Sequence, residues 1–272
     1  MAVGEYIDGA SQDVRPAAEQ WNGKAWSLTP VPFSASASLT SLEGVFCVTA
    51  KDCWAVGRSG PSTLTVHWNG TTWSTQPSPS PQPGQLNTLQ GVACPSATDC
   101  WAAGVTSHIY TPPGGYTRSL LEHWDGTSWS VAASPPGAVT LYGVSCAGRS
   151  ACLAVGDTSA TIAAAQRWNG SRWLNLAPAK PSASLYWFNA VSCPGPATCE
   201  AVGGSTAGSL AQSWNGATWT VQQMPPSVAF TADGLSCTAA ANCWSVGFVA
   251  VTTDSTTPGI EHWNGTRWSH VT

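Results

Sequence analysis

Trp68-Asn69-Gly70-Thr71-Thr72-Trp73 is one of six copies of a Trp-Asn/Asp-Gly-x-x-Trp motif in this 272-residue chain. The copies begin at Trp21, Trp68, Trp124, Trp168, Trp214 and Trp263, with spacings of 47, 56, 44, 46 and 49 residues. Such a period is typical of repeat proteins, in which each repeat buries its apolar face against its neighbours. The sequence therefore predicts a single domain over residues 1–272. Its repeat units are expected at approximately 1–30, 31–79, 80–135, 136–178, 179–225 and 226–272.

All ten cysteines fall into Cys-x5-Cys pairs that alternate with this motif. The pairs are Cys47/Cys53, Cys94/Cys100, Cys146/Cys152, Cys193/Cys199 and Cys237/Cys243. Structural zinc sites favour a shorter Cys-x2–4-Cys spacing, with a second pair or histidines nearby. We therefore predict five disulfides within the repeats, each facing across a hairpin and pinning its register, and no metal or cofactor. Disulfides on this scale indicate an oxidising compartment and thus a secreted protein.

Each repeat contains four short apolar runs separated by turn residues. In one repeat these runs are 89–94, 100–104, 119–124 and 128–131. Runs of this length at this period predict an all-β propeller of six blades, each with four antiparallel strands. Five or seven blades stay open at this point. The first blade is expected to be incomplete, because Met1-Ala2-Val3-Gly4 aligns with Trp54-Ala55-Val56-Gly57, directly after a second cysteine. This alignment favours a larger parent polypeptide or complex.

The motif itself predicts a tight turn between the third and fourth strands. Asn-Gly is expected to supply the positive φ angles of that turn. The two tryptophans then lie opposite each other across the two strands. Twelve of the 16 tryptophans belong to this motif, and we interpret them as core between blades rather than as ligand platforms.

Composition excludes several classes of function. Charged residues make up only 9% of the chain and the formal net charge is −4, which argues against nucleic acid as a partner. No apolar run approaches the ~20 residues that span a bilayer. His67, His123 and His262 occupy equivalent repeat positions, so we interpret them as surface residues that do not converge on a metal. Because no paired carboxylates or nucleophile motif stands out, the sequence predicts a non-enzyme.

Positions that vary between repeats are the candidates for ligand binding, since the common frame does not require them. A polar or phenolic residue interrupts each first strand, and these residues are expected to line the channel, either as a binding ring or with ordered water. The first-strand candidates are Glu43, Gln90, Tyr142, Asn189 and Asp233. A second variable slot lies just before the motif, where Glu122 and Glu261 are candidates. The aromatic candidates are Tyr110 and Tyr116 on the longest insertion and Trp187 in an aromatic cluster.

The repeat pattern Leu-x-Gly-Val-Ser-Cys, Cys-x-Ala-Val-Gly and Trp-Asn-Gly-x-x-Trp-Ser resembles repeats of secreted bacterial lectin-like β-propellers. The resemblance covers essentially the whole chain and implies carbohydrate binding. Residues 121–126 are also similar to the Glu-x-x-Trp-Asp-Gly turn of six-bladed fucose-binding lectins, with one residue fewer before the turn. Those lectins carry an arginine on the preceding strand, where this chain has Ala-Val-Gly.

These observations favour a non-catalytic secreted module that binds a glycan or a cell-surface polymer. The alternative is a protein-interaction or structural propeller of a larger secreted protein, with a secreted protein as its partner. A glycoside hydrolase or sialidase-like enzyme is less favoured, because the required carboxylates and arginines do not recur together.

Overall fold

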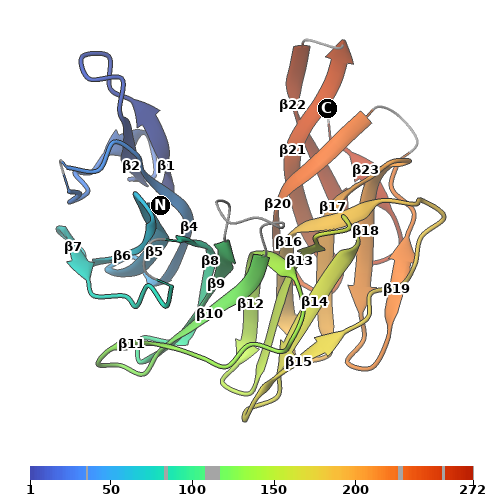
Figure 1. The fold of residues 1–272 in the computed structure, drawn as a ribbon. Helices are drawn as coiled ribbons and strands as arrows, with labels where there is room; N and C mark the ends of the chain where they lie inside the picture. Colours follow the sequence, from blue (N-terminus) through green and yellow to red (C-terminus); the bar gives the residue numbers. More distant parts are fainter. Residues whose placement is uncertain (35, 83–84, 108–116, 226–228, 253–254, 272) are drawn as a thin grey trace. The chain divides into compact units, whose positions relative to one another are not determined.

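The fold is an all-β propeller of six blades, as the sequence predicts (Figure 1). The computed structural model describes residues 1–272 except 35, 83–84, 108–116, 226–228, 253–254 and 272. Five blades are four-stranded antiparallel sheets and the first is a three-stranded sheet. The chain divides into two compact units, Met1–Ala138 and Val139–Thr272, and each contains three blades.

The first unit contains blades one to three. Its strands are β1 (Ala2–Ile7), β2 (Val14–Trp21), β3 (Trp26–Leu28), β4 (Thr40–Thr49), β5 (Asp52–Ser59), β6 (Ser62–Trp68), β7 (Trp73–Gln76), β8 (Leu86–Ser96), β9 (Asp99–Ser107), β10 (Thr117–Trp124) and β11 (Trp129–Val131). The core of this unit lies between neighbouring sheets. For example, Leu42 and Val66 of the second blade pack with Ala18 and Val31 of the first.

The second unit contains blades four to six. Its strands are β12 (Val139–Gly148), β13 (Ala151–Thr158), β14 (Ala163–Trp168), β15 (Trp173–Leu176), β16 (Tyr186–Gly195), β17 (Thr198–Ser205), β18 (Gly208–Trp214), β19 (Trp219–Gln222), β20 (Ala229–Ala239), β21 (Asn242–Thr252), β22 (Ser255–Trp263) and β23 (Trp268–His270). Each blade meanders in sequence order, so every repeat supplies one whole sheet.

All five predicted disulfides are present, and each joins the first and second strands of its blade. They are Cys47–Cys53, Cys94–Cys100, Cys146–Cys152, Cys193–Cys199 and Cys237–Cys243. The zinc alternative is therefore wrong.

The hairpin that carries each disulfide has a tight turn. Five residues separate the two cysteines in sequence, but Thr49 pairs with Asp52, so the turn is only two residues long. The same two-residue turn closes the hairpins of Cys100, Cys152, Cys199 and Cys243, because the strands pair on both sides of it. Most of the five residues between the cysteines therefore belong to the strands.

The two cysteines of each disulfide face each other across the first and second strands, as predicted. Their Cα atoms are 3.9–4.0 Å apart in all five blades. The register shifts by one residue near the turn of each hairpin, for example between Cys47 and Thr49.

The two cysteines of a pair are not equally buried. The second cysteines are the more enclosed set: Cys53, Cys100, Cys152, Cys199 and Cys243 are at most 4% exposed. Among the first cysteines, Cys47, Cys146 and Cys237 are partly exposed. The second strand is covered by its neighbours on both edges, so its cysteine lies in the core. The disulfides are therefore part of the frame of each blade.

The tryptophans of the motif face each other, as predicted. Each pair is opposite in register, for example Trp68 with Trp73, and the ring centroids of the six pairs are 5.4–6.0 Å apart. In the turn, only the glycine has a positive φ, between 91° and 97° in all six copies. The asparagine has a different role from the one predicted: Asn69 Oδ1 accepts the backbone N–H groups of Thr71 and Thr72. Aspartate can replace it, because it carries the same acceptor.

A glycine in the second strand allows the backbone of the first strand to come unusually close. A Cβ atom on Gly57 would lie 2.9 Å from Leu42 Cα and would overlap the carbonyl oxygen of Ser41. The same backbone obstruction exists at the equivalent glycines, which are Gly104, Gly156, Gly203 and Gly247. Gly4 has the same Ala-Val-Gly context in the three-stranded first blade, and a Cβ there would meet nothing within 4 Å. The glycine is therefore required by the contact with the first strand.

This difference provides a matched pair of variants. Gly57→Ala is expected to lower the free energy of unfolding by about 1–3 kcal/mol, because backbone atoms cannot yield to the added methyl group. Gly4→Ala should change it by less than about 1 kcal/mol, because the site is open. Urea denaturation of both oxidised variants measures the difference. Equal losses would show that the glycine is needed for its own conformation rather than for the close approach.

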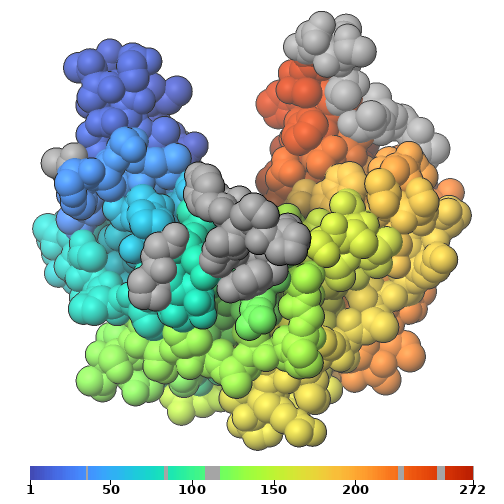
Figure 2. Space-filling model, viewed as in Figure 1, coloured from blue at the N-terminus to red at the C-terminus, as the bar shows by residue number. Residues whose placement is uncertain are grey.

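The motif tryptophans differ in burial between blades. Trp68 and Trp73 are 4% and 5% exposed, and Trp73 Nε1 donates to Thr29 Oγ1 of the first blade at 3.0 Å. Trp21 and Trp26 of the first blade are 47% and 50% exposed. The β1–β2 hairpin of this blade, in dark blue, forms a surface-exposed end of its unit (Figure 2).

Burial therefore predicts unequal costs at one motif position. Trp68→Ala should destabilise the protein by about 3–5 kcal/mol, the usual cost of truncating a buried aromatic residue. Trp21→Ala should cost clearly less, because much of that side chain already contacts solvent. Thermal midpoints of the two variants test this, and a smaller loss at Trp68 than at Trp21 would contradict it.

Candidate functional site

The variable polar residues of the first strands lie in β-bulges. In each four-stranded blade, the pairing of the first strand with the second skips one residue. The skipped residues are the five predicted candidates Glu43, Gln90, Tyr142, Asn189 and Asp233. A bulge leaves its extra residue outside the ladder and redirects the side chain. A polar residue that varies between repeats is therefore tolerated in this apolar strand because the bulge places it outside the ladder.

Several bulge residues already have polar partners. Glu43 Oε1 accepts a hydrogen bond from Ser41 Oγ at 2.7 Å. Asn189 Nδ2 donates to Asp233 Oδ1 at 3.3 Å and to the carbonyl oxygen of Ala232 at 2.9 Å, and so links β16 to β20. Burial raises the pKa of Asp233, and the bond from Asn189 opposes this shift. The role of these bulge residues in ligand binding stays a prediction.

The aromatic candidates are distributed differently. Tyr142 lies beside Asp157, and burial is the main cause that raises the pKa of both groups. Trp187 is partly buried on β16, with its ring against Gly204, where a Cβ would come within 2.5 Å of the ring. Tyr110 and Tyr116 lie outside the described residues.

The slot that precedes the motif is buried and contacts the neighbouring blade. In four blades it holds Glu122, Gln166, Gln212 or Glu261, and none of these is more than 1% exposed, whereas Val66 occupies it in the second blade and the partly exposed Glu19 in the first. Gln212 shows the contact most fully. Its Oε1 accepts the N–H of Ala179 at 2.9 Å, and its Nε2 donates to the carbonyl oxygen of Ala179 at 2.8 Å. Because Ala179 follows β15, this side chain fastens the end of the fourth blade to the fifth.

Within the described part of the chain, Glu122 and Glu261 form no ion pair with a cationic side chain. Glu122 Oε2 accepts a hydrogen bond from Ser78 Oγ at 2.7 Å, and burial raises the pKa of Glu122 to about 8. In the sixth blade, Pro225 stands at the position equivalent to Ala179, and proline has no N–H to donate. Among the described residues Glu261 Oε2 has no partner, and burial raises the pKa of Glu261 to about 7. A protonated carboxyl resembles an amide in shape, which explains why Glu and Gln share the slot.

Two equivalent grooves open between neighbouring blades of the second unit. Each is bounded by residues that follow a fourth strand and by the Trp-Asn-Gly-x-x-Trp turn of the next blade. The groove between blades four and five has a volume of about 410 Å³ and is lined by Leu176, Ala177, Ala179, Trp214, Ala217, Thr218 and Trp219. The groove between blades five and six has a volume of about 320 Å³ and is lined by Gln222, Gln223, Met224, Pro225, Trp263, Thr266, Arg267 and Trp268.

The groove between blades five and six carries more polar chemistry than the other. Trp263 is partly exposed, and Arg267 is exposed. Gln222 is held in place, because its Oε1 accepts the indole N–H of Trp268 at 2.6 Å and its Nε2 donates to Glu200 Oε1 at 3.4 Å. Behind Gln222, burial raises the pKa of Glu200 to about 8. The groove therefore combines an aromatic face with polar groups, of which Gln222 is fixed by its own hydrogen bonds.

Sequence analysis did not identify these grooves. Their walls come from two successive repeats, so Gln223 and Arg267 are far apart in sequence. The signal that was available is variation at the two x positions of the motif: Ala217 and Thr218 in one copy, Thr266 and Arg267 in another.

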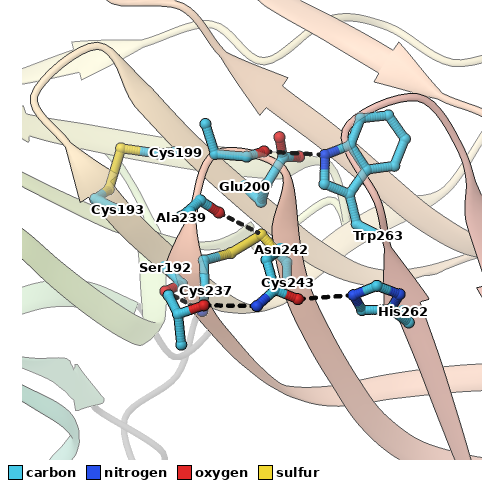
Figure 3. The surroundings of a disulfide bond; sticks show 12 residues. Ser192, Cys193, Cys199, Glu200, Cys237, Ala239, Asn242, Cys243, His262 and Trp263 are labelled. Carbon is cyan, nitrogen blue, oxygen red and sulfur yellow. Dashed lines mark hydrogen bonds between the residues drawn. A yellow bond between two sulfur atoms is a disulfide. The ribbon is translucent and has the colours of Figure 1, made fainter.

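The equivalent histidines each contact an aromatic ring and an acceptor near a disulfide. His67 Nε2 donates to Asp52 Oδ1 at 2.7 Å, with the centroid of the Trp54 ring 4.7 Å from that of the histidine. Figure 3 shows the corresponding bond from His262 to Asn242, at 2.7 Å, beside the disulfide of Cys243. His123 has the same environment with Asp99 and Trp101. These histidines are partly exposed, with side-chain exposures of 28% for His67 and 32% for His123, and they also brace the disulfide hairpin against the third strand.

Comparison with known proteins finds similarity in structure only. No protein-family model matches the chain, and no curated protein matches it. A fungal lectin from Aleuria aurantia, described as a six-bladed β-propeller with a novel fucose recognition mode, matches with a TM-score of 0.60 and 13% identity, over 98% of this chain and 89% of the lectin.

A second kind of match is to YCF48. The structure of YCF48 bound to a D1 peptide matches with a TM-score of 0.52 and 16% identity, over 84% of this chain and 67% of that chain. YCF48 from Cyanidioschyzon merolae gives 0.51 and 14%, over 91% and 88%. At these identities the matches show the fold alone. Within the described ranges, no helix is of a length and hydropathy to cross a membrane.

The buried glutamates predict a stability that depends on pH. The folded-state pKa of Glu122, about 8, lies above its usual value of 4.5. Its stabilising contribution is therefore complete below about pH 4.5 and is lost as the pH rises through about 8. We expect the free energy of unfolding to fall by a few kcal/mol between about pH 5 and pH 8.

The variant Glu122→Gln should remove part of this fall, because an amide does not titrate and the same slot holds glutamine in two other blades. Glu19→Gln is the matched control, since Glu19 shares the slot but is partly exposed. Urea denaturation at several pH values measures the slopes. A slope that Glu122→Gln leaves unchanged would mean that this carboxyl is ionised in the folded protein.

Proposed function

We propose that this chain is a non-catalytic, secreted module that binds carbohydrate on a cell surface or polymer. The observation that carries the proposal is the groove between blades five and six, which is lined by Trp263, Gln223 and Arg267. Sugars present apolar C–H faces and many hydroxyl groups. A partly exposed indole ring with a few convergent polar groups is the kind of site that binds such a ligand.

Three further features favour this proposal. The structural similarity to a fucose-recognising lectin gives the fold a precedent for binding sugars. Five disulfides suit a secreted protein. Among the described residues, those that line either groove include no Asp or Glu, whereas glycoside hydrolysis requires a pair of carboxyl groups at the bond that is cleaved.

A protein-binding propeller is the second candidate function. It is favoured by the similarity to YCF48, whose structure contains a bound D1 peptide. In that case the partner of this chain is a protein segment, and the same scaffold serves as an interaction module of a larger secreted protein.

A glycan array followed by calorimetry distinguishes the two candidates. We expect binding to a defined glycan, competed by the free sugar. Gln223→Ala should weaken it by about threefold to tenfold, the usual value of one neutral hydrogen bond. Gln20→Ala, an amide on the first blade, is the control. If no glycan on the array binds and the protein captures a secreted peptide or protein instead, the second candidate is supported.

A further inference from the structure

The two grooves of the second unit have the same architecture but different charge. The corresponding positions of the turn hold Thr218 in one groove and Arg267 in the other. Arg267 is the one charged residue that lines either groove in the described part of the chain. A ligand therefore contacts only uncharged described residues in the groove between blades four and five, and can contact a guanidinium group in the groove between blades five and six.

The turn leaves the Arg267 side chain available. Asn264 Oδ1 accepts the backbone N–H groups of Thr266 and Arg267, each at 3.0 Å. Arg267 is thus held in the turn through its backbone, and its guanidinium group makes no ion pair with any described residue. Arg267 is exposed and lines the groove, so a ligand can reach its guanidinium group, which carries five N–H donors.

The other described residues that line this groove carry no anionic side chain that could pair with Arg267. They are amide, hydroxyl, thioether, proline and indole side chains. Glu200 is the acidic residue in the hydrogen-bond network of the groove, but it is buried behind Gln222, which bonds it. An anionic group on a ligand would find an unneutralised guanidinium in the same groove as the Trp263 ring and the Gln223 amide.

We propose that the groove between blades five and six selects saccharides that carry a carboxylate or sulfate group, with Arg267 as the residue that determines this specificity. The guanidinium plane matches either anion, because both offer two oxygens to its parallel N–H groups. The sugar ring lies against Trp263, and Gln223 bonds a neighbouring hydroxyl. This inference rests on the proposed function and narrows it to one ligand class at one groove.

The test compares ligands that differ only in charge. Calorimetry measures the binding of a galacturonic acid oligosaccharide, its methyl ester and a sulfated oligosaccharide to the whole protein. The free acid should bind about tenfold to a hundredfold more tightly than its ester, the range for a charge-assisted hydrogen bond. Arg267→Thr should abolish this preference, and added salt should reduce it. Comparison of the sulfated oligosaccharide with the free acid shows whether the groove binds sulfate, carboxylate or both.

The equivalent position offers a gain-of-function variant. Thr218→Arg places a guanidinium group in the groove between blades four and five, and it should add a second site for the acid. Both substitutions are at exposed turn residues whose backbone N–H groups are bonded by the asparagine of the turn. Thr218→Arg also removes a 3.3 Å bond from Thr218 Oγ1 to Asn215 Oδ1, so the thermal midpoints should change little.

Each outcome separates this inference from the proposed function. Equal binding of acid and ester, or a preference that survives Arg267→Thr, would overturn the inference. Binding of neutral glycans alone would also overturn it while leaving the carbohydrate proposal intact. If no glycan of any kind binds, the proposed function fails and the inference fails with it.

Discussion

The close contact between the second-strand glycine and the first-strand backbone is the constraint on which each four-stranded blade depends. With no side chain at Gly57, the backbone at Leu42 comes within a distance that any Cβ would prevent. The ladder then skips the next residue, Glu43, before pairing resumes at Gly44. One position is therefore fixed as glycine, and the position that bulges out beside it is free to vary. The frame and the variable positions of the first strand have a single geometric origin.

Contacts between blades use a small set of side chains in a repeated arrangement. Trp54 of the second blade packs against Trp124 and Trp129 of the third, with ring centroids 4.7 and 5.2 Å apart. The buried slot adds a polar fastening, such as that from Gln212 to the loop of the preceding blade. Aromatic packing provides much of the buried apolar area, while the polar fastening fixes how the loop sits. The grooves are the space that remains outside these contacts.

Much of the fold is predictable from sequence, because the repeat places equivalent residues in register. The pairing of the cysteines and the opposed tryptophans follow from spacing, and both are confirmed. Spacing did not reveal that the turn between Cys94 and Cys100 is only two residues long, because strand and loop residues look alike over so short a stretch.

The chemistry of the candidate sites was harder to predict than the frame. The burial of Glu122, which raises its pKa, was not predictable, because the sequence alone does not show which residues enclose a carboxyl group. The histidine contacts were hinted at by joint variation: blades with Trp54 or Trp244 have a histidine on the third strand, whereas the blade with Leu153 has Arg167. The grooves were not predicted because their walls come from two successive repeats.

The way in which the turn at their edge is held has a consequence for how such a protein can change over generations. Asn264 Oδ1 accepts the backbone N–H of Arg267, so the turn does not depend on the side chain at that position, whereas Thr266 also bonds Asn264 through its hydroxyl group. A single codon change there alters the chemistry at the mouth of one groove and leaves the blade intact. The groove residues of one blade can therefore change separately, while the other blades keep theirs.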